Sequence, residues 1–314
     1  MKQPLIIITG PTAVGKTEAS IQLAKKLNGE IISADSMQVY KTMDIGTAKI
    51  TKEEMMGVPH HLIDILSPEQ DFNVYTFQQL AMAAVEDICS RGKIPILVGG
   101  TGFYIQALLY GISFKEETTS SRSEFEKILE EKGNVFLHNM LKEIDPVSAD
   151  IIHPNNAKRV IRALEFYQEN GEPISKHNEI ERQKESQFQS VYFVLNMPRE
   201  QLYERINLRI DQMLDAGLIK EVTALKESGI KREMTSMQGI GYKEVLDYLD
   251  GETTYEDMVY LLKRDTRHFA KRQITWFKRE RDVIWIDKTK YQNSEELSED
   301  LVRIAKEKLQ VESD

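Results

Sequence analysis

The sequence of 314 residues contains a single cysteine, Cys89. One thiol can form neither a disulfide within the chain nor a cysteine-rich zinc site, so both are excluded and a reducing compartment is favoured. No apolar run reaches the roughly 18 to 20 residues that a membrane span requires. The segment Met1–Ile8 leads directly into an apolar strand and lacks the pattern of a signal peptide. We therefore expect a cytoplasmic protein without a membrane segment.

The sequence also lacks an excess of positive charge. It has 41 Lys and Arg residues against 50 Asp and Glu residues, a formal net charge of −9. Proteins that coat nucleic acid indiscriminately depend on excess Lys and Arg, so that class is excluded. The charge is nevertheless uneven: Lys263–Arg281 carries eight bases and two acids, which leaves −15 for the rest of the chain. A local basic surface therefore remains compatible with the acidic total.

Strand and helix patterns alternate in the N-terminal part of the chain. Apolar segments at 5–9, 30–35 and 94–98 predict buried strands, and the segments 16–27 and 81–89 have helical periodicity. This alternation is typical of a parallel α/β sheet flanked by helices.

The pattern changes after about Ser113. From Lys115 to Ser190 the sequence is charged and helical, and the next convincing strand is Val191–Leu195. We therefore expect a core domain formed by 1–113 and 191–314, interrupted by an all-helical insertion domain at 114–190.

The segment Gly10–Thr17 fits the phosphate-binding pattern G-x-x-x-x-G-K-[ST] and lies between a predicted strand and a predicted helix. This context predicts a P-loop NTPase-like fold and a bound di- or triphosphate. Backbone N–H groups and the helix N-terminus would surround the phosphate oxygens, Lys16 would supply a positive charge, and the Thr17 hydroxyl would hold Mg²⁺. The residues expected to bind the diphosphate are Gly10, Pro11, Thr12, Ala13, Val14, Gly15, Lys16 and Thr17.

No acid follows the strand at 94–98, which ends in Gly99-Gly100, whereas P-loop NTPases usually hold Mg²⁺ with an Asp at such a strand end. This departure weakens an ordinary ATPase or GTPase assignment. The carboxylate of Asp35 ends the second strand instead, at the edge where ligands bind in open α/β sheets. It suits a general base or an indirect Mg²⁺ ligand, although an Asp at a strand end is as often a turn residue. The Gln38 amide has the paired donor and acceptor that match an adenine edge.

Eight motifs occur in an order that resembles the tRNA isopentenyltransferase family, whose bacterial members are tRNA dimethylallyltransferases. They are Gly10–Thr17, Asp35–Tyr40, Met43–Lys49, Val58–Asp64, Gly99–Ala107, Arg162–Glu165, Gly239–Lys243 and Lys271–Trp276. The resemblance spans about residues 5 to 280 and is much more specific than the P-loop alone. Lys41 stands where the family pattern has Arg, and Phe103 where it has Leu; both keep the charge or apolar character.

The resemblance implies transfer of a dimethylallyl group from dimethylallyl diphosphate to N6 of the adenosine on the 3′ side of a tRNA anticodon. Lys16 and Mg²⁺ would stabilise the departing diphosphate, and Asp35 would accept the proton of the amine. Thr101 would lie near the reacting groups, although its hydroxyl could instead cap a helix. Ser36, Met37 and Gln38 would line the pocket around the base, so these residues, Asp35 and Thr101 are expected to contact tRNA.

A basic helix is the expected RNA-binding element of the core domain. At about 100° per residue, one arc of a helix over 255–280 collects the bases Lys263, Arg264, Arg267, Lys271, Lys278 and Arg281. A separate, core-facing arc collects Val259, Leu262, Phe269, Trp276 and Phe277. A solvated charged face would carry mixed signs, so RNA contact is favoured. The tRNA-binding residues expected here are Lys263, Arg267, Lys271 and Arg272.

A second basic cluster, Lys158, Arg159 and Arg162, lies in the insertion. By resemblance it would contact the anticodon stem-loop, and the alternative is a surface helix paired with Glu165 and Glu169. We hypothesise that the insertion swings to grip the tRNA. Whether an Arg of the insertion or Arg209 reaches the diphosphate is left open.

The leading hypothesis is a monomeric tRNA prenyltransferase that uses Mg²⁺. The alternatives are a P-loop kinase of small metabolites, an adenylate isopentenyltransferase acting on free AMP, ADP or ATP, and a non-catalytic RNA-binding module. The basic helix disfavours the first two alternatives, and Asp35 with the intact P-loop disfavours the third.

Overall fold

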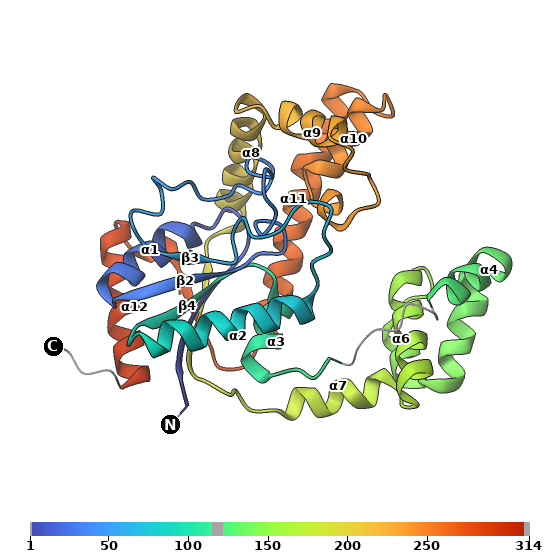
Figure 1. Ribbon diagram of the computed structural model, residues 1–314, viewed down its shortest axis with the longest axis horizontal. Coiled ribbons are helices and arrows are strands. Elements are labelled where there is room, and N and C mark those ends of the chain that lie inside the picture. The colour runs from blue at the N-terminus through green and yellow to red at the C-terminus, as the bar shows by residue number, and fades with distance from the viewer. Residues whose placement is uncertain (1, 115–121, 311–314) are drawn as a thin grey trace. The chain divides into compact units, whose positions relative to one another are not determined.

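The computed structural model describes residues 2–114 and 122–310 (Figure 1). Residues 115–121, which are part of the expected insertion, and residues 311–314 lie outside the described residues. Within the described part of the chain, no helix is both long and apolar enough to cross a membrane.

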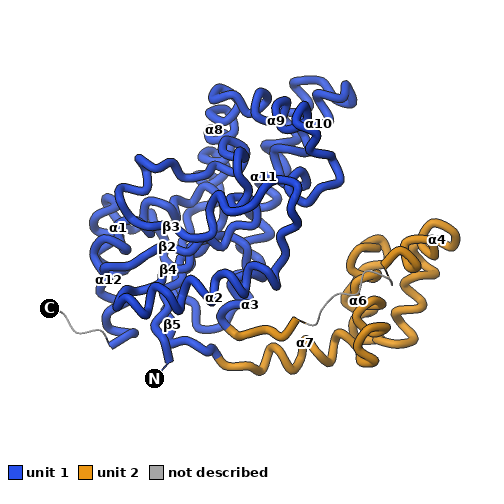
Figure 2. Tube along the Cα trace, viewed as in Figure 1, with its two compact units in different colours: residues 1–109, 186–314 blue, residues 110–185 orange. Residues whose placement is uncertain are grey.

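The chain divides into two compact units, coloured separately in Figure 2. The first unit combines Met1–Leu109 with Ser186–Asp314, and the second unit is Tyr110–Glu185. The second unit overlaps the insertion expected at 114–190.

A parallel sheet forms the centre of the first unit. Among the described residues it has six strands in the order β3-β2-β4-β1-β5-β6, and each neighbouring pair is parallel. The strands are β1 (Pro4–Thr9), β2 (Gly29–Ala34), β3 (His60–His61), β4 (Ile94–Gly99), β5 (Gln189–Asn196) and β6 (Val283–Asp287). The predicted fold class is confirmed. The sequence did not predict β3, because two residues show no periodicity.

Helices flank this sheet (Figure 1). Helices α1 and α12 pack against each other and on the sheet, α2 packs on β2 and β4, and α8, α9, α10 and α11 form a helical group. Their bounds are α1 (Lys16–Lys26), α2 (Val74–Ser90), α3 (Gly102–Tyr110), α8 (Arg199–Asp215), α9 (Leu218–Glu227), α10 (Tyr242–Leu249), α11 (Tyr255–Phe277) and α12 (Ser294–Leu309). The strand β1 is buried on both faces, as its unbroken apolar run Leu5–Ile8 predicts.

The register of the three neighbouring strands β2, β4 and β1 determines what meets at their carboxyl ends. Thr9 is paired with Gly99, and Gly99 is paired with Ala34. The residues that follow these three in sequence therefore emerge side by side. They are the start of the phosphate loop, Asp35, and the turn that leads to Thr101.

The second unit is entirely helical in its described elements. These are α4 (Arg122–Ile144), kinked at Gly133, α5 (Pro146–Ile151), α6 (Ala157–Asn170) and α7 (Ile174–Gln183). It has its own apolar core, which includes Leu137, Leu141, Val160 and Leu164. A separate core is what an independently packed domain requires.

A buried carboxylate anchors the amino end of β2. Glu30 is 2% exposed, and its oxygens accept hydrogen bonds from Arg91 (2.5 and 2.8 Å) and Lys93 (2.8 Å). His61 Nε2 of β3 lies 2.8 Å from the same carboxylate. The hydrogen bonds from Arg91 hold the pKa of Glu30 well below its usual range, against the opposing effect of burial. This cluster fixes the strand whose other end carries Asp35.

We predict that Glu30→Gln lowers the free energy of unfolding at pH 7 by about 2 kcal/mol, the scale of hydrogen bonds to charged groups. The Glu30 pKa is lower in the folded than in the unfolded chain. Its stabilisation is therefore complete above the unfolded pKa of about 4.3 and is lost as the pH falls below that value. Urea unfolding should show the variant's deficit shrinking between pH 5 and pH 3. Glu295→Gln, at an exposed surface pair, is the control; a deficit in Glu30→Gln that is constant with pH would contradict the prediction.

Candidate active site

The phosphate loop joins β1 to α1 in a conformation that requires glycine at two positions. Gly10 and Gly15 have φ values of +143° and +92°. A Cβ at Gly10 would lie 2.4 Å from the carbonyl oxygen of Leu195, and one at Gly15 would lie 2.6 Å from Nζ of Lys288. The loop therefore lies directly against β5 and against a lysine that follows β6.

Lys16 lies at the start of α1 and folds back over the loop. Its Nζ donates to the carbonyl oxygens of Gly10 (3.0 Å) and Pro11 (2.9 Å). Burial, followed by the charge of Arg209, lowers the pKa of Lys16 to about 8, against an opposing effect of Asp35. A cation at this position is costly unless an anion compensates it.

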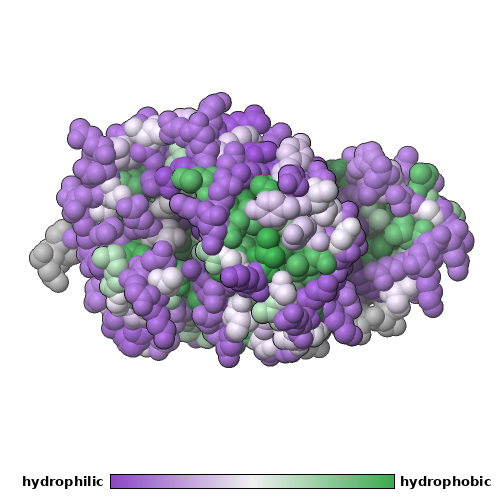
Figure 3. All heavy atoms as spheres, turned by 90° about the horizontal axis from the view of Figure 1, so that it is seen from above, coloured by the Kyte–Doolittle hydropathy of each residue, from purple (hydrophilic) through white to green (hydrophobic). Residues whose placement is uncertain are grey.

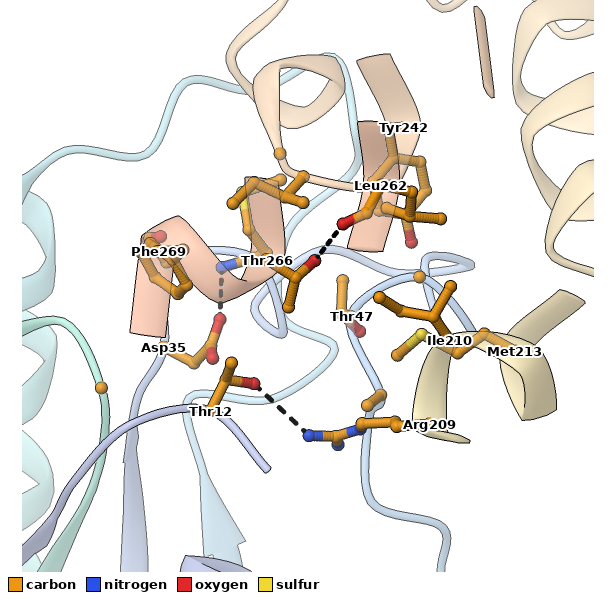
Figure 4. A pocket seen from close by; sticks show the side chains of 18 of the residues that line it. Thr12, Asp35, Thr47, Arg209, Ile210, Met213, Tyr242, Leu262, Thr266 and Phe269 are labelled. Carbon is orange, nitrogen blue, oxygen red and sulfur yellow. Dashed lines mark hydrogen bonds between the residues drawn. The ribbon is translucent and has the colours of Figure 1, made fainter. Parts of the chain in front are cut away.

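Two arginines of α8 contact the same loop. Arg205 Nε donates to the carbonyl oxygen of Ala13 at 2.9 Å, and Arg209 lies 3.5 Å from the hydroxyl of Thr12 (Figure 4). These residues are four apart and so share one face of the helix. Burial lowers the pKa of Arg209. The structure thus brings Arg209, which the sequence left undecided, to the phosphate loop.

Lys288 is a further cation at the loop, supplied by the turn after β6. Its Nζ lies against Gly15, and the guanidinium of Arg205 is also close to that glycine. Burial lowers the pKa of Lys288, while Glu18 opposes the shift. The sequence reasoning missed Lys288 and Arg205, because a single basic residue distant in sequence carries no signal of its position in space.

Asp35 follows β2, and the two oxygens of its carboxylate differ in their contacts. Its Oδ1 accepts from the backbone N–H groups of Met37 (2.9 Å) and Gln38 (3.3 Å), which makes a local turn. The other oxygen, Oδ2, has no hydrogen-bond partner among the described residues, and Asp35 lines the cavity beside the loop. One oxygen therefore fixes the carboxylate and the second faces the site. The Gln38 amide donates to the carbonyl oxygens of Thr47 and Ala48, so it supports a neighbouring loop.

The cavity has a volume of about 360 Å³ and adjoins the phosphate loop. In Figure 4, Asp35 and Thr12 lie near the strand ends, and Ile210 and Met213 project from α8. Phe269 and Leu262 of α11 complete an extensive apolar lining. Figure 3 looks from above, and hydrophobic side chains gather in the middle of that face among polar ones. Within the described residues, Asp35 is the only carboxylate that lines the cavity.

A carboxylate holds the loop that forms one wall of the cavity. Glu221 of α9 accepts from the backbone N–H groups of Asp44 (2.9 Å), Ile45 (2.7 Å) and Gly46 (3.1 Å). It also accepts from the hydroxyl of Tyr242 at 2.7 Å. Three converging N–H groups form an anion-binding nest, here occupied by a side chain of the protein. The wall loop is therefore fixed to α9 and α10.

Gln273 connects α11 to two strand ends. Its Oε1 accepts from the backbone N–H of Thr12 at 2.8 Å, and its Nε2 donates to the carbonyl oxygen of Gly100 at 3.0 Å. A Cβ at Gly100 would lie 2.1 Å from that Nε2, so a side chain at this position would displace the Gln273 amide. The motif Lys271–Trp276 carried part of the family resemblance, but the amphipathic pattern of the helix gave no reason to select Gln273 from it.

Thr101 precedes α3 and lines the cavity. Its carbonyl oxygen accepts from the backbone N–H groups of Tyr104 and Ile105, as at a helix start. No described residue hydrogen-bonds to its hydroxyl. Thr101 thus lies at the start of α3, but its side chain does not cap the helix. Its hydroxyl is therefore available to a ligand in the cavity.

Helix α11 ends earlier than the sequence predicted. It stops at Phe277, and Lys278 to Glu280 form a turn before Asp282, which has a left-handed φ of +56°. The predicted helix to about residue 280 is therefore wrong. The physical reason is that the chain must reverse to enter β6 at Val283. Lys278 and Arg281 consequently lie beyond the helix and not on its basic face.

The apolar arc predicted for this helix is only partly correct. Leu262 and Phe277 are buried, and Val259 is partly buried. Phe269 instead lines the cavity, and Trp276 is 37% exposed. The angular pattern identified one side of the helix, but it could not separate core positions from positions that face a cavity.

Two of the four predicted RNA-binding bases of α11 are held by α8. Lys263 pairs with Asp211 at 2.6 Å, and Arg267 donates to the Asn207 side chain at 2.7 Å. These contacts connect α11 to the helix that carries Arg205 and Arg209. Sequence periodicity could not show them, because the partner helix was unknown.

The other two predicted bases are exposed. The Lys271 side chain faces solvent, and Arg272 lies over the ring of Phe269, with 5.7 Å between guanidinium carbon and ring centroid. Arg272 also lines the cavity. The predicted bases nearer the start of α11 therefore contact α8, whereas those nearer its end are exposed.

The basic residues predicted in the insertion lie at the start of α6. Lys158 and Arg159 are exposed, and Arg162 is partly buried. Glu165 of the same helix is buried, with Arg122 of α4 at 3.9 Å. The exposed pair is available to a ligand of the second unit, and contact of this cluster with tRNA stays a prediction.

The model of the family described as IPP transferase matches residues 38–280. A tRNA dimethylallyltransferase of Lachnoclostridium phytofermentans is 59% identical over 98% of both chains. One from Acetivibrio thermocellus is 48% identical over 95% of this chain and 96% of its own length.

Solved structures agree with these relatives. The full-length tRNA isopentenylpyrophosphate transferase of Bacillus halodurans superimposes with a TM-score of 0.75 at 46% identity, covering 98% of this chain and 97% of that one. A eukaryotic dimethylallyltransferase acting on tRNA gives 0.81 at 32% identity, covering 99% of this chain and 80% of that one. The resemblance found in the sequence is confirmed, and the chain belongs to the IPP transferase family.

Proposed function

We propose that the protein transfers a dimethylallyl group from dimethylallyl diphosphate to N6 of the adenosine on the 3′ side of a tRNA anticodon, releasing diphosphate. The observation that carries this proposal is the convergence of Lys16, Arg205, Arg209 and Lys288 on one phosphate loop, next to an apolar cavity with a single lining carboxylate. Four cations match a diphosphate, and the apolar lining matches a prenyl group. The relatives named above act in the same class of reaction.

The proposed step is a displacement at the first carbon of the prenyl group. The N6 lone pair forms the new C–N bond while the C–O bond to the diphosphate breaks, and its electron pair leaves with the diphosphate. Oδ2 of Asp35 takes the proton from N6, because Oδ1 is engaged by Met37 and Gln38. The cations at the loop stabilise the negative charge that develops on the leaving group. No water needs activation, which is consistent with the lack of an acid after β4.

Magnesium fits the donor set at this site. The Thr17 side chain is exposed at the end of the loop. Mg²⁺ is usually held by one or two protein oxygens, substrate phosphates and water. Among the described residues, no three His, Cys, Asp or Glu side chains form a metal site of their own. Mg²⁺ would therefore bind with the diphosphate, held by the Thr17 hydroxyl, and would supply charge neutralisation.

The proposed macromolecular partner is the anticodon stem-loop of tRNA. The target adenine must leave its stack to enter a closed cavity, which costs a few kcal/mol and least in a single-stranded loop. We propose that Lys271 and Arg272 of the first unit and Lys158, Arg159 and Arg162 of the second contact the RNA, the second unit gripping the stem-loop. A tRNA substrate implies a cytoplasmic enzyme, and we propose that it acts as a monomer.

Purified protein, labelled dimethylallyl diphosphate and alternative acceptors test the activity directly. Label should enter an anticodon stem-loop and should not enter free AMP. Label found only in AMP would replace the proposal by an adenylate isopentenyltransferase. Transfer of phosphate from ATP to a small metabolite, without prenyl transfer, would instead indicate a kinase.

Asp35→Asn should lower kcat by about 100- to 10,000-fold, the usual contribution of a general base. The amide keeps an oxygen for the turn at Met37, so KM for dimethylallyl diphosphate should change little. Steady-state kinetics with saturating stem-loop measure both constants. Glu86→Gln, at an exposed carboxylate of α2, should behave as the parent protein. Normal turnover by Asp35→Asn would remove Asp35 as the base.

The pKa of about 8 for Lys16 predicts a pH dependence of diphosphate binding. Lys16 is charged below this value, so kcat/KM for dimethylallyl diphosphate should fall as the pH rises through 8, because this ratio reports groups of the free enzyme. Lys16→Met should lower kcat/KM at pH 7 by about 100-fold and abolish that descending limb. Initial rates between pH 6.5 and 9.5 provide the test, and a limb that survives in Lys16→Met would assign it to another group.

Lys271→Glu should weaken binding of the stem-loop and flatten its salt dependence, because each phosphate contact contributes about one to the slope of log K against log salt. The affinity for dimethylallyl diphosphate should not change. Filter binding at several salt concentrations measures the slope. The matched control is Lys25→Glu, an exposed lysine of α1. Equal slopes for Lys271→Glu and the parent protein would exclude this residue from the RNA surface.

A further inference from the structure

Two exposed aromatic side chains meet beside the cavity. Phe103 lies in the first turn of α3 and Trp276 in the last turn of α11. Their ring centroids are 6.4 Å apart with an interplanar angle of 66°, an edge-to-face pair. Phe103 is 41% exposed and Trp276 is 37% exposed. The two rings therefore present aromatic surface to solvent that a ligand could cover.

The indole of Trp276 is held in one orientation. A Cβ at Gly102 would lie 2.2 Å from its Nε1, so the ring edge rests directly on the Gly102 backbone. The carboxylate of Glu280 is hydrogen-bonded to the Trp276 indole and accepts from Gln106 Nε2 at 2.7 Å. The ring is therefore an ordered surface, ready to receive a planar group at little further cost in entropy.

The aromatic pair adjoins the cavity through both of its elements. Phe103 is two residues after Thr101, and Trp276 is one helical turn after Arg272, on the same side of α11. Thr101, Arg272 and Phe269 all line the cavity. A turn of helix rises about 5.4 Å, so the pair lies about one nucleotide beyond a base held in the cavity.

Several exposed bases lie close to Trp276 in the sequence. Lys271 and Arg272 precede Trp276, and Lys278 and Arg279 follow it, all with exposed side chains. Single-stranded RNA is bound by just this combination, in which aromatic rings stack on bases and cations hold the adjacent phosphates. An apolar protein partner would match the rings but would leave the cations uncompensated.

We infer that Phe103 and Trp276 form a stacking site for the nucleobase adjacent to the adenosine that is modified. This inference rests on the proposed function and extends it, because it assigns a ligand to a surface outside the cavity. The site takes a planar base of the unstacked anticodon loop, through the π-faces of the rings and without base-specific hydrogen bonds. It would hold the loop open while the target base occupies the cavity.

A stem-loop with 2-aminopurine on the 5′ or the 3′ side of the target adenosine tests the contact without catalysis. Binding to the parent protein should quench the fluorescence at one of these positions, since stacking quenches this base. Phe103→Leu keeps an apolar side chain on α3 and should abolish much of the quenching. It should also raise Kd for the unmodified stem-loop by about 5- to 150-fold, the range of one base–aromatic stack. Tyr75→Leu, at an aromatic of α2 that is 48% exposed, is the matched control and should bind as the parent protein does.

Stem-loops that lack the base on the 5′ or the 3′ side of the target adenosine test whether that base stacks on Phe103. Removing the stacked base should weaken binding to the parent protein and should remove the difference between the parent protein and Phe103→Leu. If the variant stays weaker on both abasic loops, or if neither 2-aminopurine position is quenched, the stacking site is wrong. Such a result with prenylation of the normal stem-loop intact would overturn this inference alone. No prenylation of any stem-loop by the parent protein would overturn the proposed function.

Discussion

The candidate site depends on the hydrogen-bonded register of β2, β4 and β1. Because Ala34, Gly99 and Thr9 are paired across the sheet, the chain leaves all three strands at the same level. A one-residue slip of β2 would move Asp35 away from the phosphate loop and would turn its side chain to the other face. The register is secured at the opposite end of β2, where buried Glu30 is held by basic side chains. A charged cluster distant from the cavity thus fixes the position of the proposed base.

Around this edge the protein concentrates positive charge at considerable electrostatic cost. Burial lowers the pKa values of Lys16, Arg209 and Lys288, so each is more difficult to keep charged than in water. Such a cluster is stable only when an anion of several charges is shared among its members. Burial makes the cations unfavourable when no anion is bound. It therefore favours the binding of a diphosphate, both within the substrate and as the leaving group. Gln273 then links the loop to α11, the helix that also bears the exposed basic and aromatic residues.

The formal net charge of −9 is unevenly distributed along the chain. The proposed RNA-binding segment Lys263–Arg281 is basic, whereas the rest of the chain is acidic in sum, and this distribution would disfavour binding of nucleic acid elsewhere. Lys263 and Arg267 also contact α8, so the predicted RNA-binding bases of this segment that are free of that helix lie toward its C-terminal end. The exposed end of α11 combines its remaining charges with Trp276 and Phe103, so that stacking and charge lie on one surface.

The sequence by itself determined the elements and the family. Unbroken apolar runs predicted the buried strands, the glycines and Lys16 predicted the phosphate loop, and the ordered motifs predicted the family. Tertiary structure decided what these patterns could not encode. It placed Arg205, Arg209 and Lys288 at one loop, selected Gln273 from an amphipathic helix, and ended α11 at Phe277. The reason is physical: local propensity and periodicity act over a few residues, whereas the position of a charge relative to a distant loop is set by the packing of the whole sheet and its helices.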